Sequence, residues 1–283
     1  MTANDAPQTA NDALRAAILR LRYAGIADPT RDARLLLAHA MEIDADRLTL
    51  HLSDTLAATA ASHYAKLVTA RLTHQPIAQI VGHRLFWGRK FRVTKDTLDP
   101  RPETETLIAE ALKAPAKTVL DLGIGTGAIL LTLLAEWPDA RGTGTDISPA
   151  ALAVAQSNAQ SLDLAPRATL ILSDWFTAIP DRYDLVTSNP PYLAADELQF
   201  LAPDVFDFEP HIALTPGGDG LNAYRAIAAG APSHLAPGGR LIVEIGPAQG
   251  HAVSALICAA GLLDVSIVKD LDGRDRVVSA RVP

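Results

Sequence analysis

Cysteine is almost absent from this sequence, which carries only Cys258. One cysteine can form no disulfide within the chain, and it cannot build a thiolate zinc cluster. Its surroundings, Ala-Leu-Ile-Cys-Ala-Ala, predict the buried face of a helix, because free cysteine is among the most buried residue types. We therefore expect Cys258 to pack in the core without a chemical role, and we predict no metal site.

Long apolar runs are also missing. No stretch of about 20 apolar residues is present to span a bilayer. The first residues, Met1–Asp5, lack the basic segment and the apolar segment of a secretory signal. The hydrophobic fraction of 48% and the charged fraction of 20% are typical of a folded globular protein rather than a disordered one. Together these features predict a cytoplasmic enzyme of bacterial type, with no membrane partner.

An excess of positive charge is the third absence, since the formal net charge is -7. Nucleic-acid binders gain much of their affinity by neutralising phosphates, so this balance argues against a direct nucleic-acid partner. An acidic stretch has two open interpretations, a solvated loop or a surface for a basic protein partner. It consists of Asp196, Glu197, Asp204, Asp207 and Glu209.

Three regions of the chain differ in their pattern. Residues 1–75 are rich in alanine, place apolar residues at helical spacing and predict a small helical bundle. Residues 76–95 combine aromatic and β-branched side chains with glycines, which predicts a β-hairpin linker. Residues 96–283 alternate short apolar runs with helical stretches, as in α/β proteins whose mostly parallel sheet is covered by helices on both faces. No internal repeat is present.

A glycine-rich turn joins the first strand of the third region to its first helix. It contains Asp121, Gly123, Ile124, Gly125, Thr126 and Gly127. Glycines allow a tight turn and let a ligand approach the backbone. Asp146, which ends the next strand, is placed to accept hydrogen bonds from two ribose hydroxyls. Its alternative role is a charge at a helix N-terminus. Dinucleotide-binding enzymes and S-adenosylmethionine (AdoMet) enzymes share these features.

The chemistry of the two ligands separates them. A dinucleotide needs its pyrophosphate over the helix N-terminus, whereas AdoMet carries a free ammonium that Asp121 could attract. After the third strand, Asp174 could accept from the adenine amino group and Trp175 could stack on the adenine ring. A plain core position is the alternative for Trp175. We favour AdoMet as the cofactor.

The most informative motif is Asn189-Pro190-Pro191-Tyr192, which follows the fourth strand. The two prolines fix two backbone torsions and hold the Pro190 carbonyl rigidly. Asn189 adds a side-chain oxygen, so two acceptors face the two hydrogens of a planar NH₂ group. This grip stabilises the charge that grows on nitrogen during methyl transfer. Tyr192 would flank the target group and exclude water. The alternative is a rigid turn without chemistry.

Several segments together resemble one family, the PrmC/HemK glutamine N5-methyltransferases of peptide-chain release factors. The Asp121–Gly127 turn and Asn189–Tyr192 are joined by five further matches. These are Gln75–Gly82, Arg101–Glu105, Gly217–Leu221, Glu244–Gly246 and Gly273–Arg276. The resemblance covers nearly the whole chain. One position departs from the family pattern, because Asp99 precedes Pro-Arg-Pro where the family usually has an apolar residue.

The resemblance implies a class I AdoMet-dependent methyltransferase fold, Rossmann-like, with a seven-stranded sheet whose last strand is antiparallel. It implies that the substrate is the glutamine amide of the Gly-Gly-Gln loop of a release factor. AdoMet contacts would fall on Gly123–Gly127, Asp146, Trp175 and Asn189. Substrate contacts would fall on Asn189, Pro190, Pro191 and Tyr192. We predict that residues 1–75 dock this protein substrate and that residues 96–283 form the methyltransferase domain of a monomer. Glu103 and Glu105 have either a substrate role or a helix-terminal one.

Three other functions are compatible with parts of the pattern. A sister enzyme that methylates glutamine in a ribosomal protein differs from this assignment only through the resemblance. An N6-adenine methyltransferase would need a basic groove and a base-flipping pocket, which the acidic balance disfavours. A binding module that uses the fold as a scaffold would not need the intact cofactor turn, Asp146 and Asn189.

Overall fold

The computed structural model describes residues 8–283, and these divide into two units. The first unit holds the N-terminal helices up to Gly82 together with residues 203–208 of the later chain. The second unit holds residues 83–202 and 209–283. Met1–Asp5, where we predicted no secretory signal, lies outside the described residues. No helix in residues 8–283 combines the length and the apolar character needed to cross a bilayer.

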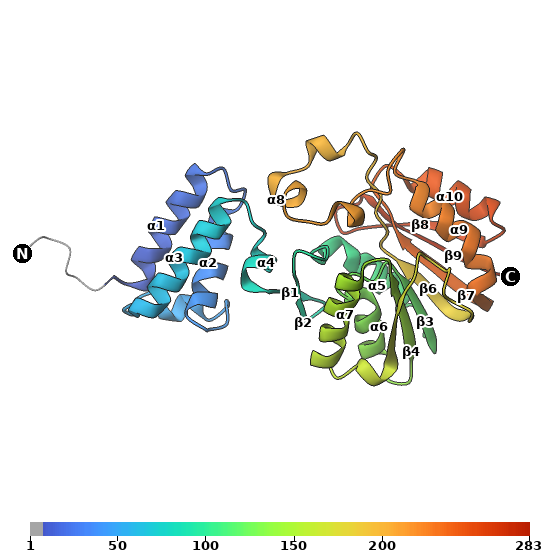
Figure 1. Cartoon of the computed structure of the whole chain (residues 1–283), viewed down its shortest axis with the longest axis horizontal. Helices are drawn as coiled ribbons and strands as arrows, with labels where there is room; N and C mark the ends of the chain where they lie inside the picture. The colour runs from blue at the N-terminus through green and yellow to red at the C-terminus, as the bar shows by residue number, and fades with distance from the viewer. Residues whose placement is uncertain (1–7) are drawn as a thin grey trace, which may run out of the picture. The chain divides into compact units, whose positions relative to one another are not determined.

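The first unit is helical, which confirms the predicted N-terminal bundle. Helices α1, α2 and α3 lie side by side around a shared apolar core (Figure 1). The first two begin where the sequence supplies caps: Thr9 forms a capping box with Asp12, and Asp28 accepts from the Arg31 amide. The helices are α1 (Ala10–Tyr23), α2 (Pro29–Ala40), the 3₁₀ helix η1 (Leu48–His51), α3 (Ala58–Leu72), α4 (Ile77–Val81) and α8 (Pro203–Phe206).

Residues 203–208 are held in the first unit by polar contacts. The buried Arg71 donates to Asp32 at 2.7 Å, and its guanidinium lies 3.8 Å from Asp204. The Gln79 side chain donates to the Phe208 carbonyl at 2.8 Å. The chain that follows the Asn-Pro-Pro-Tyr motif therefore returns to the N-terminal bundle before it re-enters the second unit.

The hairpin is shorter than the predicted linker at 76–95. Its first part, Ile77–Val81, is the helix α4, which ends at Gly82 with φ of 79°. The prediction was wrong there because Ile77, Ile80 and Val81 are β-branched, yet their spacing of three and four residues suits a helix. The hairpin itself joins β1 (His83–Phe86) to β2 (Arg89–Arg92).

The second unit contains the seven-stranded sheet, in the order β5-β4-β3-β6-β7-β9-β8. The first five of these strands are parallel, and β9 is antiparallel to both neighbours, as expected for the last strand of the chain. The strands are β3 (Thr118–Leu122), β4 (Arg141–Asp146), β5 (Ala168–Leu172), β6 (Tyr183–Ser188), β7 (Leu235–Glu244), β8 (Leu263–Lys269) and β9 (Asp275–Arg281).

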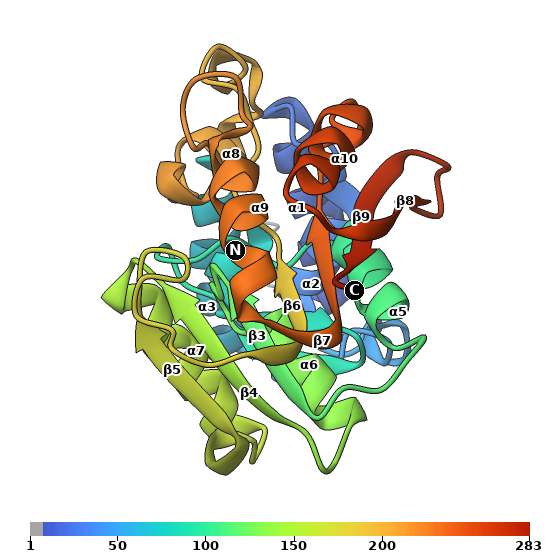
Figure 2. The same cartoon turned by 90° about the vertical axis from the view of Figure 1, so that its right-hand side faces the viewer.

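Helices cover both faces of this sheet, which confirms the predicted α/β fold class (Figures 1 and 2). Helices α5, α6 and α7 share one apolar core with the sheet, and α9 and α10 share the other. Their bounds are η2 (Pro102–Thr104), α5 (Glu105–Ala111), α6 (Ala128–Glu136), α7 (Pro149–Ser161), η3 (Ala165–Arg167), η4 (Leu198–Phe200), η5 (His211–Ala213), α9 (Asn222–His234) and α10 (Gly250–Ala259).

The prediction that Cys258 is buried was wrong, because its side chain is exposed. Helix α10 buries Val253 and Ile257, four residues apart, against the sheet. Cys258 follows Ile257 by one residue and so projects about 100° away from that stripe. Its neighbours Ala255 and Ala259 are exposed as well, because small alanines do not need burial.

Candidate active site

The carboxyl ends of β3, β4, β5 and β6 meet at one edge of the sheet, because these strands are neighbours and parallel. The loops that follow them line an open cleft. Ligands of α/β sheets bind at this kind of edge. The lining residues are Asp96, Thr97, Leu98, Gly123, Gly125, Asp146, Ile147, Ser148, Ala151, Ser173, Asp174, Trp175, Asn189, Pro191, Pro210, Ile212 and Ala213.

Two glycines of the predicted cofactor turn line this cleft with their backbone. Gly123 and Gly125 have φ of 70° and 53°, and a Cβ added at either would meet no atom within 4 Å. A ligand can therefore lie directly against the main chain at both positions. The Gly125 amide also donates to Asp146 at 3.0 Å, which ties the turn to the end of β4.

Three other residues of the turn face away from the cleft. The Ile124 side chain packs over Gly144, where an added Cβ would lie 2.1 Å from its Cδ1. Thr126 is buried, and its carbonyl accepts from Asn158 at 2.8 Å. Gly127 immediately precedes α6, with φ of 83°. These residues shape the turn, and any contact with the cofactor would pass through their backbone.

Asp146 lies in the cleft with its carboxylate held in place. One oxygen accepts from the Gly125 amide at 3.0 Å, and the other accepts from the Ser148 amide at 2.9 Å. Burial raises the pKa of Asp146, while these amide hydrogen bonds act in the opposite direction. Each carboxylate oxygen has a second lone pair, so two ribose hydroxyls can still be accepted.

Asp121 does not line the cleft, because it is buried at the end of β3 with an exposure of 1%. Thr187 of the neighbouring strand donates to its Oδ1 at 2.9 Å. Its Oδ2 has no hydrogen-bond partner within residues 8–283. Burial raises the pKa of Asp121 to about 7. A buried carboxylate with an unsatisfied oxygen is a favourable neighbour for a ligand ammonium.

The third predicted segment turns sharply after β5. Trp175 lines the cleft with φ of 47°, and the exposed Asp174 lies beside it. Ser173 holds this conformation, because its hydroxyl donates to the Trp175 carbonyl at 3.1 Å and accepts from the Ala178 amide at 3.0 Å. The indole is therefore presented by a fixed turn.

The Asn-Pro-Pro-Tyr motif brings Asn189 and Pro191 to the same cleft. Pro190 is buried, and Tyr192 packs against the apolar core that α9 and α10 share with the sheet. The Tyr192 amide donates to Leu214 at 3.2 Å, and its carbonyl accepts from Gln249 at 2.8 Å. The Asn189 Nδ2 donates to a threonine hydroxyl, which leaves Oδ1 for a ligand. Across the described chain, neither this Oδ1 nor the Pro190 carbonyl accepts a hydrogen bond.

Two cleft-lining segments were missed by the sequence interpretation. One is Asp96–Leu98, in which Thr97 is buried and its hydroxyl has no partner among residues 8–283. The other is 210–213, which includes Ile212, an apolar side chain with 57% exposure. For the first segment, the clearest sequence signal of a cleft wall was Leu98, an apolar residue just before the rigid Pro100 and Pro102.

Charged side chains before and at the start of α5 make contacts within the protein. Asp99, the departure from the family pattern, is buried and lies 3.6 Å from Arg84. Glu105 accepts from the Trp87 amide at 3.2 Å. Glu209 of the acidic stretch is also buried, and Arg101 donates to it at 2.6 Å. The interpretation of that stretch as one solvated loop was therefore wrong at Glu209.

Two family models match the chain. Residues 12–82 match the model described as the PrmC N-terminal domain, and residues 94–221 match the methyltransferase small domain. A release factor glutamine methyltransferase of Cereibacter sphaeroides is 65% identical over 274 residues, which cover 97% of this chain and 99% of that relative. A release factor glutamine methyltransferase of Caulobacter vibrioides is 44% identical to this chain, and the match covers 92% of this chain and 91% of that relative.

The chain belongs to the release factor glutamine methyltransferase family. AdoMet is the methyl donor of this family, which decides between the two cofactors that the glycine-rich turn left open. A solved methyltransferase from Pyrococcus furiosus shares the fold, with a TM-score of 0.53, 13% identity and coverage of 78% of this chain and 98% of that one.

In this family member, the chemical groups that line the cleft match those of AdoMet. The open backbone at Gly123 and Gly125, the carboxylate of Asp146 and the indole of Trp175 suit a methionine tail, a ribose and an adenine. The buried Thr97 hydroxyl adds an unsatisfied polar atom in the wall. In residues 8–283, no cluster of His, Cys, Asp or Glu has the arrangement of a metal site.

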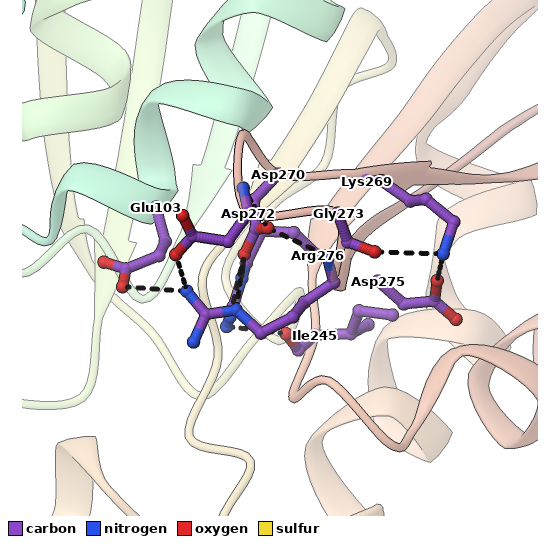
Figure 3. A network of polar contacts seen from close by, with 9 residues as sticks. Glu103, Ile245, Lys269, Asp270, Asp272, Gly273, Asp275 and Arg276 are labelled. Carbon is purple, nitrogen blue, oxygen red and sulfur yellow. Dashed lines mark hydrogen bonds and ion pairs between the residues drawn. The ribbon is translucent and has the colours of Figure 1, made fainter.

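The Gly273–Arg276 segment, another match to the family, closes the turn between β8 and β9 (Figure 3). Asp270 accepts from the Arg274 amide at 3.0 Å and pairs with the Arg276 guanidinium at 3.2 Å. Arg276 also donates to the Ile245 carbonyl at 3.3 Å, and Arg274 lies 3.9 Å from Glu103. This network fixes the end of β7 against the loop that precedes α5.

Proposed function

We propose that this protein transfers a methyl group from AdoMet to the side-chain amide nitrogen, N5, of the glutamine in the Gly-Gly-Gln motif of peptide-chain release factors. One observation carries the proposal: Asn189 and Pro191 line the same cleft as Gly123 and Asp146. The amide-gripping motif and the cofactor groups thus share one space. The names of the relatives in Cereibacter sphaeroides and Caulobacter vibrioides support the same target.

The residues that would hold AdoMet are Gly123, Gly125, Asp146, Asp174 and Trp175, with Asp121 behind the turn. The cofactor supplies an electrophilic methyl group on a sulfonium. The chain supplies the orientation of the attacking nitrogen. An amide nitrogen is a poor nucleophile because its lone pair is delocalised into the carbonyl, so binding alone is not enough.

Asn189 and Pro190 would overcome this by accepting from both hydrogens of the NH₂ group. Asn189 Oδ1 and the Pro190 carbonyl have no other hydrogen bond in the described chain, so both are available. Gripped in this way, the nitrogen turns its lone-pair face toward the methyl group. The two acceptors bind more strongly as positive charge grows on nitrogen, which lowers the barrier. The methylated nitrogen is a strong acid, so its proton leaves to solvent without a dedicated base.

We propose that the first unit docks the protein substrate. Its match to the PrmC N-terminal domain model supports a role specific to this family rather than to methyltransferases in general. The full-length chain should show a much lower KM for an intact release factor than for a short Gly-Gly-Gln peptide. Reversing exposed charges in α1 and α3, at Arg15 and Lys66, should raise only the first KM. Equal KM values for protein and peptide would contradict the docking role.

The decisive experiment is transfer of labelled methyl groups onto three purified substrates: a release factor, ribosomal proteins and DNA. The proposal predicts label on the release factor, mapped by mass spectrometry to the glutamine of Gly-Gly-Gln. Label on ribosomal-protein glutamine would favour the sister activity, and label on adenine would favour a nucleic-acid enzyme. The same proposal places the protein in the cytoplasm as a monomer. Light scattering of the purified protein tests the monomeric state.

A further inference from the structure

A threonine hydroxyl lies directly behind the amide of Asn189. Thr104 ends the short helix η2, is 3% exposed, and its Oγ1 accepts from Asn189 Nδ2 at 3.3 Å. This bond decides which end of the amide faces the cleft. With Nδ2 turned toward Thr104, Oδ1 faces a ligand. In the flipped orientation Nδ2 would face the substrate NH₂, and two donors cannot form a hydrogen bond.

A hydroxyl has only one proton, so its donor side must be committed elsewhere if it is to accept reliably from Asn189. Burial raises the pKa of Glu244, and the Thr104 hydroxyl opposes this shift as a hydrogen-bond donor, so the carboxylate lies within reach of that hydroxyl. Glu244 is the last residue of β7 and is 1% exposed. Its Oε2 has no hydrogen-bond partner within the described residues, so the carboxylate retains acceptor capacity beside Thr104.

The charged and titratable groups around Glu244 come from four elements. Arg276 of β9 and Arg101 before η2 favour its ionised form, whereas Glu103 of η2 opposes it. Tyr192 lies on the motif itself, and Tyr224 of α9 donates to the Glu244 carbonyl at 2.9 Å. The turn between β8 and β9 fixes Arg276 through Asp270 (Figure 3). Tyr224 therefore anchors the main chain of Glu244, and its carboxylate lies among charges of both signs.

We propose that Thr104 and Glu244 are positioning residues that set the orientation of the Asn189 amide. In this relay, ionised Glu244 accepts from the Thr104 hydroxyl, Thr104 accepts from Asn189 Nδ2, and Asn189 Oδ1 accepts from the substrate NH₂. The inference deepens the proposed function and rests on it for its kinetic test. It gives a role to two segments outside the cleft, Arg101–Glu105 and Glu244–Gly246.

The relay predicts a direction for the pH dependence. Burial raises the pKa of Glu244 to about 7. Above that pH the ionised carboxylate accepts from the Thr104 hydroxyl. Thr104 then accepts from Asn189 Nδ2, and Asn189 Oδ1 stays available to the substrate. Below it, a protonated Glu244 can donate to Thr104, whose own proton then points toward Asn189. This favours the flipped amide, in which Oδ1 accepts from Thr104 and Nδ2 faces the substrate NH₂. The kcat should therefore fall as the pH drops through about 7.

The kinetic test uses the full chain with a release factor as substrate. Thr104→Val keeps the size of the side chain and removes the hydroxyl. We expect its kcat to fall about 100-fold, the order expected when a preorganised hydrogen-bond partner is lost. The Kd for AdoMet, measured by calorimetry, should change by less than about threefold, because Thr104 does not line the cleft. Thr104→Ser should restore most of the lost rate.

A matched control is Thr132→Val. Thr132 is also fully buried, and its hydroxyl has no partner in residues 8–283, but it lies on α6 away from Asn189. This control should keep the wild-type kcat. If Thr104→Val is as active as Thr132→Val, the positioning role is wrong. Glu244→Gln should lower kcat and flatten the pH profile near neutrality; an unchanged profile in that variant would overturn the relay.

A second measurement does not depend on the substrate. The side-chain NH₂ resonances of Asn189, followed by NMR, should titrate with an apparent pKa near that of Glu244 and stop titrating in Glu244→Gln. If the wild-type protein transfers no methyl group to a release factor, the proposed function fails, yet this titration still decides the relay. Asn189 resonances that do not change as Glu244 titrates would refute the relay.

Discussion

Gly220 packs against the main chain of the catalytic motif, and replacing it with alanine should impair catalysis. An added Cβ would lie 2.4 Å from the Tyr192 carbonyl oxygen and 3.0 Å from the Ala194 amide nitrogen. Neither atom belongs to a flexible side chain that could move aside. Because carbon atoms pack at roughly 3.5–4.0 Å from their neighbours, the segment that carries Asn189–Tyr192 must shift by about 1 Å.

A shift of about 1 Å in a group that positions the substrate costs on the order of 100-fold in rate. We therefore expect Gly220→Ala to lower kcat by roughly that factor, with some loss of stability because its φ of 77° suits glycine. Gly217 provides a matched control in the same segment. Its φ is 75°, but an added Cβ would meet no atom within 4 Å.

The assay is steady-state methyl transfer to a release factor, with thermal unfolding measured in parallel. Both alanine variants should lose about 1 kcal/mol of stability from the left-handed backbone, and the close contact should cost Gly220→Ala roughly 1–3 kcal/mol more. Only Gly220→Ala should also lose the large factor in kcat. Equal kcat values for the two variants would show that the motif does not depend on this close contact, and the reasoning would be refuted.

Three further predictions follow from other contacts. Asn189→Ala should lower kcat by about 10²–10³ with AdoMet affinity changed only a few-fold, and full turnover in this variant would remove Asn189 from the mechanism. AdoMet affinity should rise with pH up to about 7 and then level off, because Asp121 must ionise to attract the ammonium; calorimetry on Asp121→Asn should give a flat profile. Arg71→Met should destabilise the first unit by about 3–5 kcal/mol in urea unfolding, because Asp32 stays buried without its partner, and an unchanged midpoint would contradict the value of that pair.

Much of the fold was predictable because its signals are local. The proline-opened helices at Asp28-Pro29 and Ser148-Pro149 begin where the caps predict them. The strand-turn-helix at Asp121–Gly127 follows from glycine and apolar patterning within a few residues. Where local signals conflicted, the prediction failed. At Ile77–Val81, β-branched composition suggested a strand while the spacing suited a helix.

The site was predictable only in part, because its contacts join distant residues. Asn189 and Thr104 are 85 positions apart, and no local pattern links them. The same holds for Arg101 and Glu209, whose ion pair removes one acidic residue from the surface. A glycine-rich motif identifies a cofactor turn, but the sequence does not say which of its residues face the ligand. Packing against β4 decides that, as the side chain of Ile124 shows.

The most direct measurement of the catalytic arrangement is a crystal structure of the protein with S-adenosylhomocysteine and a glutamine-containing peptide. We predict that the glutamine NH₂ donates to both Asn189 Oδ1 and the Pro190 carbonyl, with its nitrogen facing the sulfur of the cofactor product. A bound glutamine whose NH₂ is held by other groups, or an Asn189 side chain directed away from the sulfur, would contradict this account.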